Sequence, residues 1–454
     1  MPAIPQILRR NANYRRLWLA QVISEMGDWF NQVAVFAVAL HFTGSAVAIS
    51  YVLMSQTIPA VVIGPLAGVV LDRVNRQRAL IVSDVVRAFV ALGPILVTSR
   101  ARVWWLYPLT VLLASASPFF NSGRLALIPT IAGADEILPA NSITQATHST
   151  TLGIGSALAG LLIAPLGFRN AFILNSLSFA GSAFFISRMH LARTAARAAD
   201  AGAVPQRSRA EATASGEARA FRESPAAPVA VLPAQPGIPK PASRRYAWRE
   251  YRAGLAYIRR EPLVLALLLV GVGWATGGGA MQVLFSVFGD LVFHRGAFGI
   301  GMLYGAAGLG LALSAAAANW FGPRLRFAPY KRVIALCYLC YGALYIAFSQ
   351  ERSFWMAVLL IGLSRYFIGT SSVLNLTRLM RIVPDHLRGR VFATNETMTL
   401  STMLVSMLIA GIATVHFGAR DVALAAGLLS GSTALWWMLA DRLGKLREPA
   451  RYEI

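Results

Sequence analysis

The sequence predicts an all-α membrane protein with 12 transmembrane helices in two pseudo-symmetric six-helix bundles, and with both termini in the cytoplasm. Of its 454 residues, 56% are hydrophobic and only 14% are charged, whereas about a quarter of the residues of a soluble protein are charged. Apolar runs of about 20 residues, the length that spans the hydrocarbon of a bilayer, follow one another along the chain. A polar segment separates the first six runs from the last six.

Each run predicts one helix, with a turn or a short loop after it. In the first half, the expected spans are 17–42, 46–71, 79–98, 103–127, 143–166 and 171–187. In the second half, they are 263–292, 300–321, 333–348, 354–376, 391–416 and 422–439.

The distribution of positive charge predicts the orientation. With the N-terminus in the cytoplasm, most of the 42 lysines and arginines lie in cytoplasmic segments, as the positive-inside rule requires. We therefore expect a multi-pass protein of the bacterial plasma (inner) membrane with the lipid bilayer as its solvent. The net charge of +22 belongs to loops between apolar runs and not to one soluble face, so nucleic acid is not an expected partner.

The segment between the two sets of runs differs in composition from the rest of the chain. Residues 191–245 are rich in Ala, Pro, Ser and Arg, and a segment with so little hydrophobicity is expected to be a disordered cytoplasmic linker. We thus expect an N-terminal bundle over 1–190 and a C-terminal bundle over 246–454. The second bundle should begin with a basic amphipathic helix on the membrane surface. Faint similarity between 128–138 and 383–387 suggests duplication, and transporters are commonly built from such repeats.

A short basic hairpin between the second and third runs carries the most specific motif. The residues Gly68, Asp72, Arg73, Arg76 and Arg78 resemble the helix 2–3 signature of the major facilitator superfamily, G-x-x-x-D-R-x-G-R-R/K. Other stretches resemble the branch that contains macrolide efflux proteins and the enterobactin exporter. These stretches are Asn13-Tyr14-Arg15-Arg16-Leu17-Trp18, Ser24-x-x-Gly27-Asp28-Trp29, Ser83-Asp84-x-x-Arg87-Ala88 and Leu387-Arg388-Gly389-Arg390-Val391-Phe392.

The sequence departs from the family pattern at two places. Asn75 stands where many members carry glycine in the hairpin, and asparagine tolerates the left-handed backbone that a tight turn can need. The stretch 155–160 resembles the antiporter signature G-P-x-x-G-G, but Ser156 replaces the proline and Ala159 replaces one glycine.

Two carboxylates inside the first run are the main candidates for proton coupling, because charge inside a bilayer is costly and points to function. Glu25 and Asp28 are three residues apart and are expected to share one helix face near mid-depth. Neighbouring carboxylates in a low dielectric favour the protonated form, as a proton-coupled carrier needs. The alternative is that one or both only form hydrogen bonds to a neighbouring helix.

Arg365 is the matching cation, about halfway along the tenth run. The family resemblance implies that helices 1, 4, 7 and 10 line a central cavity. Arg365 is therefore expected to pair with Asp28 or Glu25, or to hold an anionic substrate, and a purely structural ion pair is the alternative.

Four further polar residues are secondary candidates. Asp84 and Arg87, three residues apart, are expected to neutralise each other. Arg124 is either a gating partner or a side chain that extends to the interface. Asn375, like His148, is either a functional polar group or a packing residue whose polar atoms are hydrogen-bonded within the protein.

The hairpin is a candidate cytoplasmic gate. The family fold would bring Asp72 near the start of the eleventh helix, where Gly389-Arg390-Val391 would offer backbone N–H groups, a positive helix end and a guanidinium. We expect Asp72 to make this contact when the cytoplasmic side is closed, and to lose it when that side opens.

These observations predict secondary active transport. The most favoured function, implied by the resemblance, is proton-coupled efflux of amphipathic, drug-like or antibiotic-like small molecules by a monomer. The alternatives are export of one specific solute, such as a siderophore or a lysophospholipid, and a non-transporting membrane sensor. An enzyme is not expected, because the sequence has no G-x-S-x-G motif, no Walker loop and no metal-ligand spacing among its six histidines. No cofactor and no metal are expected.

Overall fold

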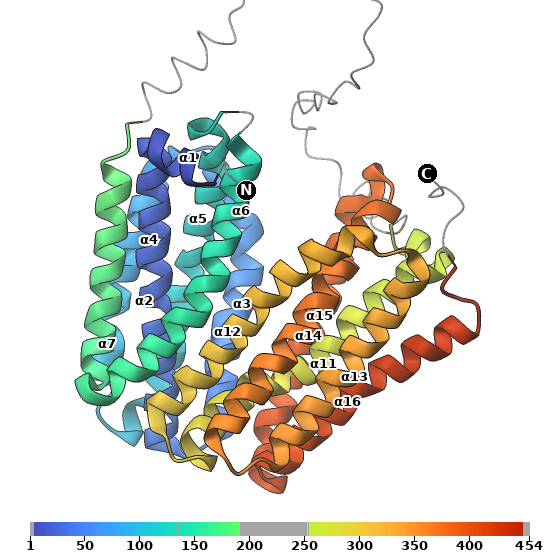
Figure 1. Cartoon of the computed structure of the whole chain (residues 1–454). Coiled ribbons are helices and arrows are strands. Elements are labelled where there is room, and N and C mark those ends of the chain that lie inside the picture. The colour runs from blue at the N-terminus through green and yellow to red at the C-terminus, as the bar shows by residue number, and fades with distance from the viewer. Residues whose placement is uncertain (1–3, 134–135, 191–251, 253, 448–454) are drawn as a thin grey trace, which may run out of the picture. The chain divides into compact units, whose positions relative to one another are not determined.

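The computed structural model describes residues 4–133, 136–190, 252 and 254–447, and over these residues the chain is helical with short turns and no β-strand (Figure 1). The chain divides into two units, of which the first comprises 1–189 with 255–454 and the second comprises 190–254. The expected linker and the start of the expected amphipathic helix lie outside the described residues. The fold described below is that of the first unit.

Over 4–133 and 136–190, the first half contains seven α-helices. Short 3₁₀ and π segments lie between some of them, at Gly93–Leu96, Arg100–Trp105 and Thr151–Gly155. The helices are α1 (Ile4–Arg10), α2 (Ala12–Thr43), α3 (Ala46–Leu71), α4 (Arg76–Val90), α5 (Leu106–Ile131), α6 (Ile137–Thr150) and α7 (Ser156–Ser187).

From Pro262 to Arg442, the described part of the second half contains six α-helices, and residues 254–260 before them are also helical. A π segment, Phe288–Val292, extends the first of them, and a 3₁₀ turn, Gly322–Arg324, follows the second. The helices are α11 (Pro262–Val287), α12 (Gly296–Phe321), α13 (Phe327–Gln350), α14 (Phe354–Ile382), α15 (Asp385–Phe417) and α16 (Ala419–Arg442).

Ten helical spans among the described residues are long and apolar enough to cross a membrane. One of them, Pro139–Ser187, includes Gly167 with φ 78° and ψ 163°. That backbone conformation is not helical and is accessible mainly to glycine, so a turn interrupts this span where the sequence predicts one, between 166 and 171. The helix α2, with Glu25 and Asp28 in its interior, is not among the ten.

Several helix boundaries differ from the predicted ones, and two of them have a clear local cause. The third predicted helix, 79–98, is shorter in the structure because α4 ends at Val90 and Gly93-Pro94 begins a 3₁₀ turn. Proline lacks the N–H that a continuing α-helix would use. The eleventh predicted helix begins six residues earlier, at Asp385, because its first turns are polar and belong to no apolar run.

The two halves repeat one pattern of helix pairing. In the first half α3 packs on α5, α4 on both α5 and α7, and α2 on α7. In the second half α12 packs on α14, α13 on both α14 and α16, and α11 on both α15 and α16. This is the repetition that a six-helix duplication would produce.

One close contact recurs in both halves. A Cβ added at Gly27 of α2 would lie 1.9 Å from Ser178 Oγ of α7, and one added at Gly277 of α11 would lie 1.9 Å from Ser430 Oγ of α16. A side chain at either glycine would therefore collide with the facing helix. Glycine lets the first helix of each half approach the last one closely.

The halves meet mainly through two helix pairs, α3 with α15 and α7 with α12, and α12 also contacts α2 and α6. Ser50 Oγ donates a hydrogen bond of 2.7 Å to the Met407 carbonyl, and a Cβ at Gly301 would lie 2.4 Å from the Ser156 carbonyl oxygen. Ser50 and Gly301 each lie near the start of their helix, at the end of the helices for which the positive-inside rule predicts an outer location.

Candidate functional site

The N-terminal end of α2 is anchored by short-range and long-range hydrogen bonds. Asn11 caps the helix, since its side chain accepts a hydrogen bond from Tyr14 N at 3.0 Å, and its amide also donates to the Ile131 carbonyl at 2.5 Å. Tyr14 Oη donates to the Ala140 carbonyl at 2.8 Å, and Trp18 Nε1 donates to Thr147 Oγ1 at 2.9 Å. The Asn-Tyr…Trp stretch thus holds α2 against α5 and α6, and this contact fixes the rotation of the helix.

Glu25 lies in a complete shell of donors on one side of α2. Its carboxylate accepts hydrogen bonds from Arg124 Nη1 at 3.0 Å, from Thr151 Oγ1 at 2.7 Å and from Gln21 Nε2 at 2.9 Å. His148 Nδ1 lies 3.5 Å away. The side chain is only 13% exposed, so Glu25 joins α2 to α5 and α6 as a buried, satisfied ion pair.

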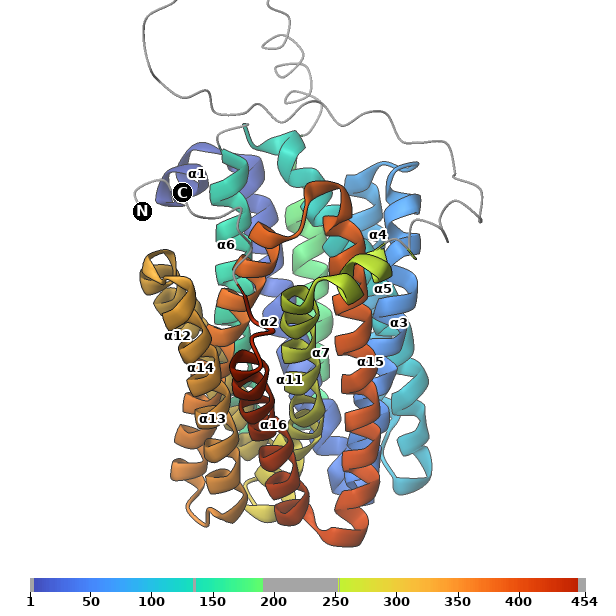
Figure 2. The same cartoon turned by 90° about the vertical axis from the view of Figure 1, so that its right-hand side faces the viewer.

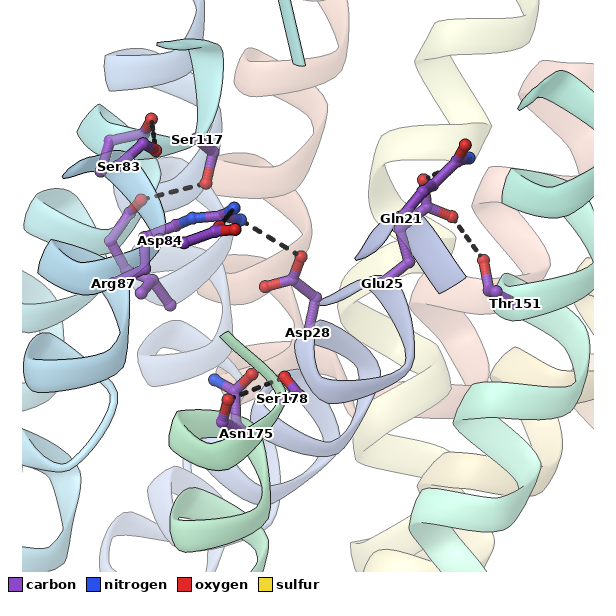
Figure 3. A network of polar contacts seen from close by, with 12 residues as sticks. Gln21, Glu25, Asp28, Ser83, Asp84, Arg87, Ser117, Thr151, Asn175 and Ser178 are labelled. Atoms are coloured by element: carbon purple, nitrogen blue, oxygen red, sulfur yellow. Dashed lines mark hydrogen bonds and ion pairs between the residues drawn. The ribbon is translucent and has the colours of Figure 1, made fainter. Parts of the chain in front are cut away.

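Asp28 points in another direction, toward α4 (Figure 3). One of its carboxylate oxygens lies 3.8 Å from Arg87 Nη1, and the side chain is 41% exposed. Arg87 also forms an ion pair with Asp84, one turn earlier on α4. Two carboxylates therefore share one guanidinium, and of the two only Asp28 is open to solvent.

Arg87 is held in place by aromatic rings as well as by charge. Its guanidinium lies 4.6 Å from the centroid of Phe120 and 4.3 Å from that of Phe179, and the side chain is 2% exposed. Cation–π contacts are strongest when the cation is desolvated. Arg87 thus has a fixed position between α5 and α7, and Asp84 beside it is fully buried.

The structure separates the two carboxylates that the sequence places on one face. Glu25 and Asp28 do not form a dyad, because each has its own arginine on a different neighbouring helix. The ion pair expected between Asp84 and Arg87 is present. Of the two alternatives for Arg124, extension to the interface does not fit, because its side chain is buried and pairs with Glu25; the gating role stays a prediction.

Arg365 lies apart from these pairs, in the second half. Neither Asp28 nor Glu25 lies within 4.0 Å of it, and no hydrogen bond or ion pair involves Arg365 among the residues that the structure describes. The guanidinium lies 5.0 Å from the ring centroid of Phe285 on α11. The expected pairing with a carboxylate of α2 is therefore not made in this conformation.

Asn375 and His148, the two lesser candidates, lie in different surroundings. Asn375 Nδ2 donates to the Leu267 carbonyl at 3.0 Å, and its Oδ1 lies 3.5 Å from Tyr330 Oη. His148 is exposed on α6, beside Glu25. The arrangement of Asn375 agrees with the packing alternative, whereas the exposed His148 is not a packing residue.

The hairpin is fixed to the first half through its middle. Arg76 Nη1 donates to the Ala126 carbonyl at 2.9 Å, and Gln77 Nε2 donates to the carbonyls of Ile186 at 2.8 Å and Met189 at 3.0 Å. Arg73 and Arg78 are exposed. The Asp72 side chain is 62% exposed and lies 3.9 Å from Arg76, and a Cβ at Gly68 would meet nothing within 4 Å.

Two details of the gate prediction need correction. Asn75 has φ −64° and ψ 113°, which is not left-handed; instead its side chain caps α4 by accepting from Arg78 N at 3.1 Å. Because α15 begins at Asp385, the N–H groups of 389–391 lie beyond its first turn and are used within the helix. With these N–H groups used within the helix, Arg390 can act at the gate only through its guanidinium. In the described part of the chain, no ion pair joins Asp72 to Arg390.

Sequence reasoning missed four residues of this site. Gln21 and Thr151 complete the shell of Glu25, while Phe120 and Phe179 enclose Arg87. Gln21 lies four residues before Glu25 on one helix face, a spacing that could have identified it. The other three come from distant helices and carry no local signal.

The chain is similar to known membrane transporters in sequence and in fold. A family model described as Major Facilitator Superfamily matches residues 17–398. The chain is 27% identical to the uncharacterized MFS-type transporter YfiS of Bacillus subtilis (strain 168) over 186 residues, which cover 41% of this chain and 43% of YfiS. It is 30% identical to the multidrug efflux pump Tap of Mycolicibacterium fortuitum over 179 residues, 38% of this chain and 44% of Tap.

A third relative is macrolide efflux protein A of Streptococcus pyogenes, 24% identical over 150 residues that cover 32% of this chain and 36% of that protein. The chain thus matches less than half the length of each of these curated relatives.

Two solved transporters share the fold over nearly the whole chain. A bacterial homologue of the iron transporter ferroportin in an inward-facing state has a TM-score of 0.65 and 16% identity, with 93% of this chain and 98% of that chain covered. A bacterial homologue of the human lysosomal transporter Spinster, inward-facing and unoccupied, has a TM-score of 0.64 and 14% identity, with coverage of 96% and 99%. With the family model spanning most of the helices, this chain belongs to the Major Facilitator Superfamily and is a multi-pass protein of the cell membrane.

Proposed function

We propose that this protein exports amphipathic, drug-like or antibiotic-like small molecules in exchange for protons, by alternating access. The observation that carries the proposal is the state of Asp28, a carboxylate within a helix that crosses the apolar core and 41% exposed beside a buried arginine. That arginine is already paired with Asp84. The relatives named as a multidrug efflux pump and a macrolide efflux protein support an export direction.

The two carboxylates on Arg87 suggest how a proton would be handled. When Asp28 takes up a proton from outside, Arg87 remains neutralised by Asp84, so no charge is left unpaired in the membrane interior. When Asp28 releases the proton to the cytoplasm, its negative charge is stabilised by the same guanidinium. Glu25, with its full set of donors, holds α2, α5 and α6 in register, and its role in coupling is indirect.

The number of spans and the side of the termini form part of the proposed function. We infer 12 spans, because Gly167 divides one of the ten apolar spans and α2 adds another. We also propose that both termini are cytoplasmic, that the bundles cover 1–190 and 246–454 on either side of a cytoplasmic linker at 191–245, and that the protein acts as a monomer. The cytoplasmic gate would consist of Gly68, Asp72, Arg73, Arg76 and Arg78 with Arg390.

The test is efflux from proteoliposomes that hold the full-length chain. Ethidium and erythromycin serve as probes, each measured with an imposed proton gradient and after its collapse. We expect gradient-driven transport by the wild type and its loss in Asp28→Asn, with insertion into the vesicles unchanged. Asp421→Asn is the matched control, because Asp421 is an exposed carboxylate in the first turn of α16.

Gradient-driven transport that survives in Asp28→Asn would refute the role of Asp28. Transport of a siderophore or a lysophospholipid, with neither probe moved, would support the specific exporter instead. No transport of any of these solutes would support the non-transporting sensor.

A further inference from the structure

Arg365 is a buried cation, and the part of the chain that the structure describes provides no counterion for it. It is 6% exposed in the middle of α14. Its Nε has no hydrogen-bond partner, and no carboxylate lies within ion-pair distance of the guanidinium among the described residues. Burying an unpaired charge is unfavourable unless another group neutralises it. The site therefore favours an anion from outside the chain.

The groups around Arg365 are aromatic. Phe285 of α11 lies under the guanidinium, and the hydroxyls of Tyr304, Tyr341 and Tyr345 lie close enough to interact with it electrostatically. Tyr304 Oη donates to the Gln282 carbonyl at 2.6 Å, and Tyr341 Oη donates to Tyr345 Oη at 3.2 Å. Neutral tyrosines supply no negative charge, so Arg365 remains uncompensated.

A cavity of about 120 Å³ opens beside this arginine. It lies between α11, α12, α13 and α14, and its lining includes Trp274, Leu311, Tyr338, Ser372 and Asn375 together with Arg365. Tyr338 Oη is already used, since it donates to the Val270 carbonyl at 2.7 Å. The walls are thus largely apolar and aromatic, with one positive charge at the side.

The same region reaches the first half through a series of aromatic contacts, one edge-to-face and one tilted. Phe285 contacts Tyr304 with ring centroids 5.5 Å apart, and Tyr304 lies 6.5 Å from Trp29, the residue that follows Asp28. A ligand that orders Phe285 and Arg365 would therefore act on a chain of contacts that ends next to the proposed proton site.

We propose that Arg365 binds the carboxylate of the transported molecule and that the aromatic walls hold its apolar part. The planar guanidinium suits a carboxylate because it can donate two parallel hydrogen bonds. A cavity of this size holds the acidic end of an amphipathic substrate, with an aromatic or aliphatic group against Trp274. The inference rests on the proposed function and narrows its substrate class to amphipathic carboxylic acids and zwitterions.

The experiment measures equilibrium binding without a gradient, so it does not depend on proton coupling. Radiolabelled 3-phenylpropionate is bound to the full-length protein in phosphatidylcholine nanodiscs, and 3-phenylpropionamide is the uncharged competitor of the same shape. We expect the wild type to bind the acid about tenfold more tightly than the amide or better, as hydrogen bonds to an ionised group predict. Arg365→Gln should bring this ratio close to one, and Arg365→Lys should keep part of it.

Arg381→Gln is the matched control, an exposed arginine near the end of the same helix, and it should keep the full preference for the acid. Equal binding of acid and amide by the wild type would overturn the proposal even if Arg365→Gln fails to fold. An unchanged ratio in folded Arg365→Gln would also overturn it. Loss of acid binding when phosphatidylglycerol is added would assign Arg365 to a lipid headgroup. Acid-selective binding without export would count against the proposed function alone.

Discussion

At the scale of single residues, two carboxylates three positions apart have different environments. Glu25 is enclosed by Arg124, Thr151 and Gln21, whereas Asp28 is partly open to solvent beside Arg87. A helix turns by about 100° per residue, so positions i and i+3 are offset by some 60°. That offset is enough to direct one side chain toward α5 and α6 and the other toward α4.

The stability of the Arg87 site can be tested by a mutant pair. Arg87→Met should lower the free energy of unfolding by about 3–5 kcal/mol, because it leaves the fully buried Asp84 without its cation. Asp84→Asn combined with Arg87→Met should recover a large part of that loss. Both variants lose the contacts with Phe120 and Phe179, so their difference reports the unpaired charge. Unfolding by sodium dodecyl sulfate in mixed micelles gives both values, and equal destabilisation of the two variants would contradict this account.

At the scale of helices, glycine decides where the halves approach each other. A Cβ at Gly301 of α12 would lie 2.5 Å from Gly160 Cα of α7, and one at Gly308 would lie 2.4 Å from Gly153 N. Backbone meets backbone here, so no side chain can move aside to relieve the overlap. Figure 2 shows α12 and α6 next to each other from a second direction. The α7–α12 contact therefore behaves as a tight seal at the predicted outer end.

Because this contact is so close, adding a single methyl group at Gly301 should open it. Gly301→Ala should separate α7 from α12 and shift the population toward states that are open at the outer end. The separation is measured between spin labels at two cysteines, which replace Arg169 and Arg352. Both residues are exposed and lie in turns on that side. The native Cys337 and Cys340 are changed to alanine in all variants. We expect a longer distance than in the parent. Gly64→Ala, where the new Cβ meets nothing within 4 Å, is the control, and equal distances in both variants would argue against the seal.

At the scale of the whole molecule, the contacts between the halves are unevenly distributed. Ser50 with Met407, and Gly160 with Gly301, join them near the predicted outer end. At the other end, Asp72 is exposed and Gly389 has open space around it. With the proposed orientation, this distribution is the one expected of an inward-open carrier, the state for which the gate prediction expects Asp72 to be released.

The role of Asp72 is therefore tested through the state that is closed on the cytoplasmic side, where its contact with Arg390 is expected. Asp72→Asn should weaken the contact with the guanidinium of Arg390 and raise the population that is open on the cytoplasmic side. Spin labels at cysteines replacing Arg188 and Arg324, both exposed, should show a larger fraction of long distances than in the parent with Cys337 and Cys340 changed to alanine. Glu351→Gln, a carboxylate of the predicted outer side, is the control. An unchanged inward/outward balance in Asp72→Asn would mean that the hairpin does not act as a latch.

Much of the fold follows from local physics and was therefore predictable. The hydrocarbon thickness sets the length of the apolar runs, so α3 was predicted with its observed bounds, and the turn near Gly167 was predicted between two runs. The first turns of α15 were missed because helices continue in polar sequence beyond the membrane, where no apolar run marks them.

The sequence by itself determined which charges interrupt apolar runs: Glu25, Asp28, Asp84, Arg87, Arg124 and Arg365 were all identifiable. Only the tertiary structure decided how they combine. Ion pairs inside a bilayer form between whichever helices pack together, and the rotation of each helix is set by contacts such as Gly27 with Ser178 and Tyr14 with Ala140. Those contacts gave Glu25 and Asp28 separate arginines and left Arg365 beside a cavity without a carboxylate.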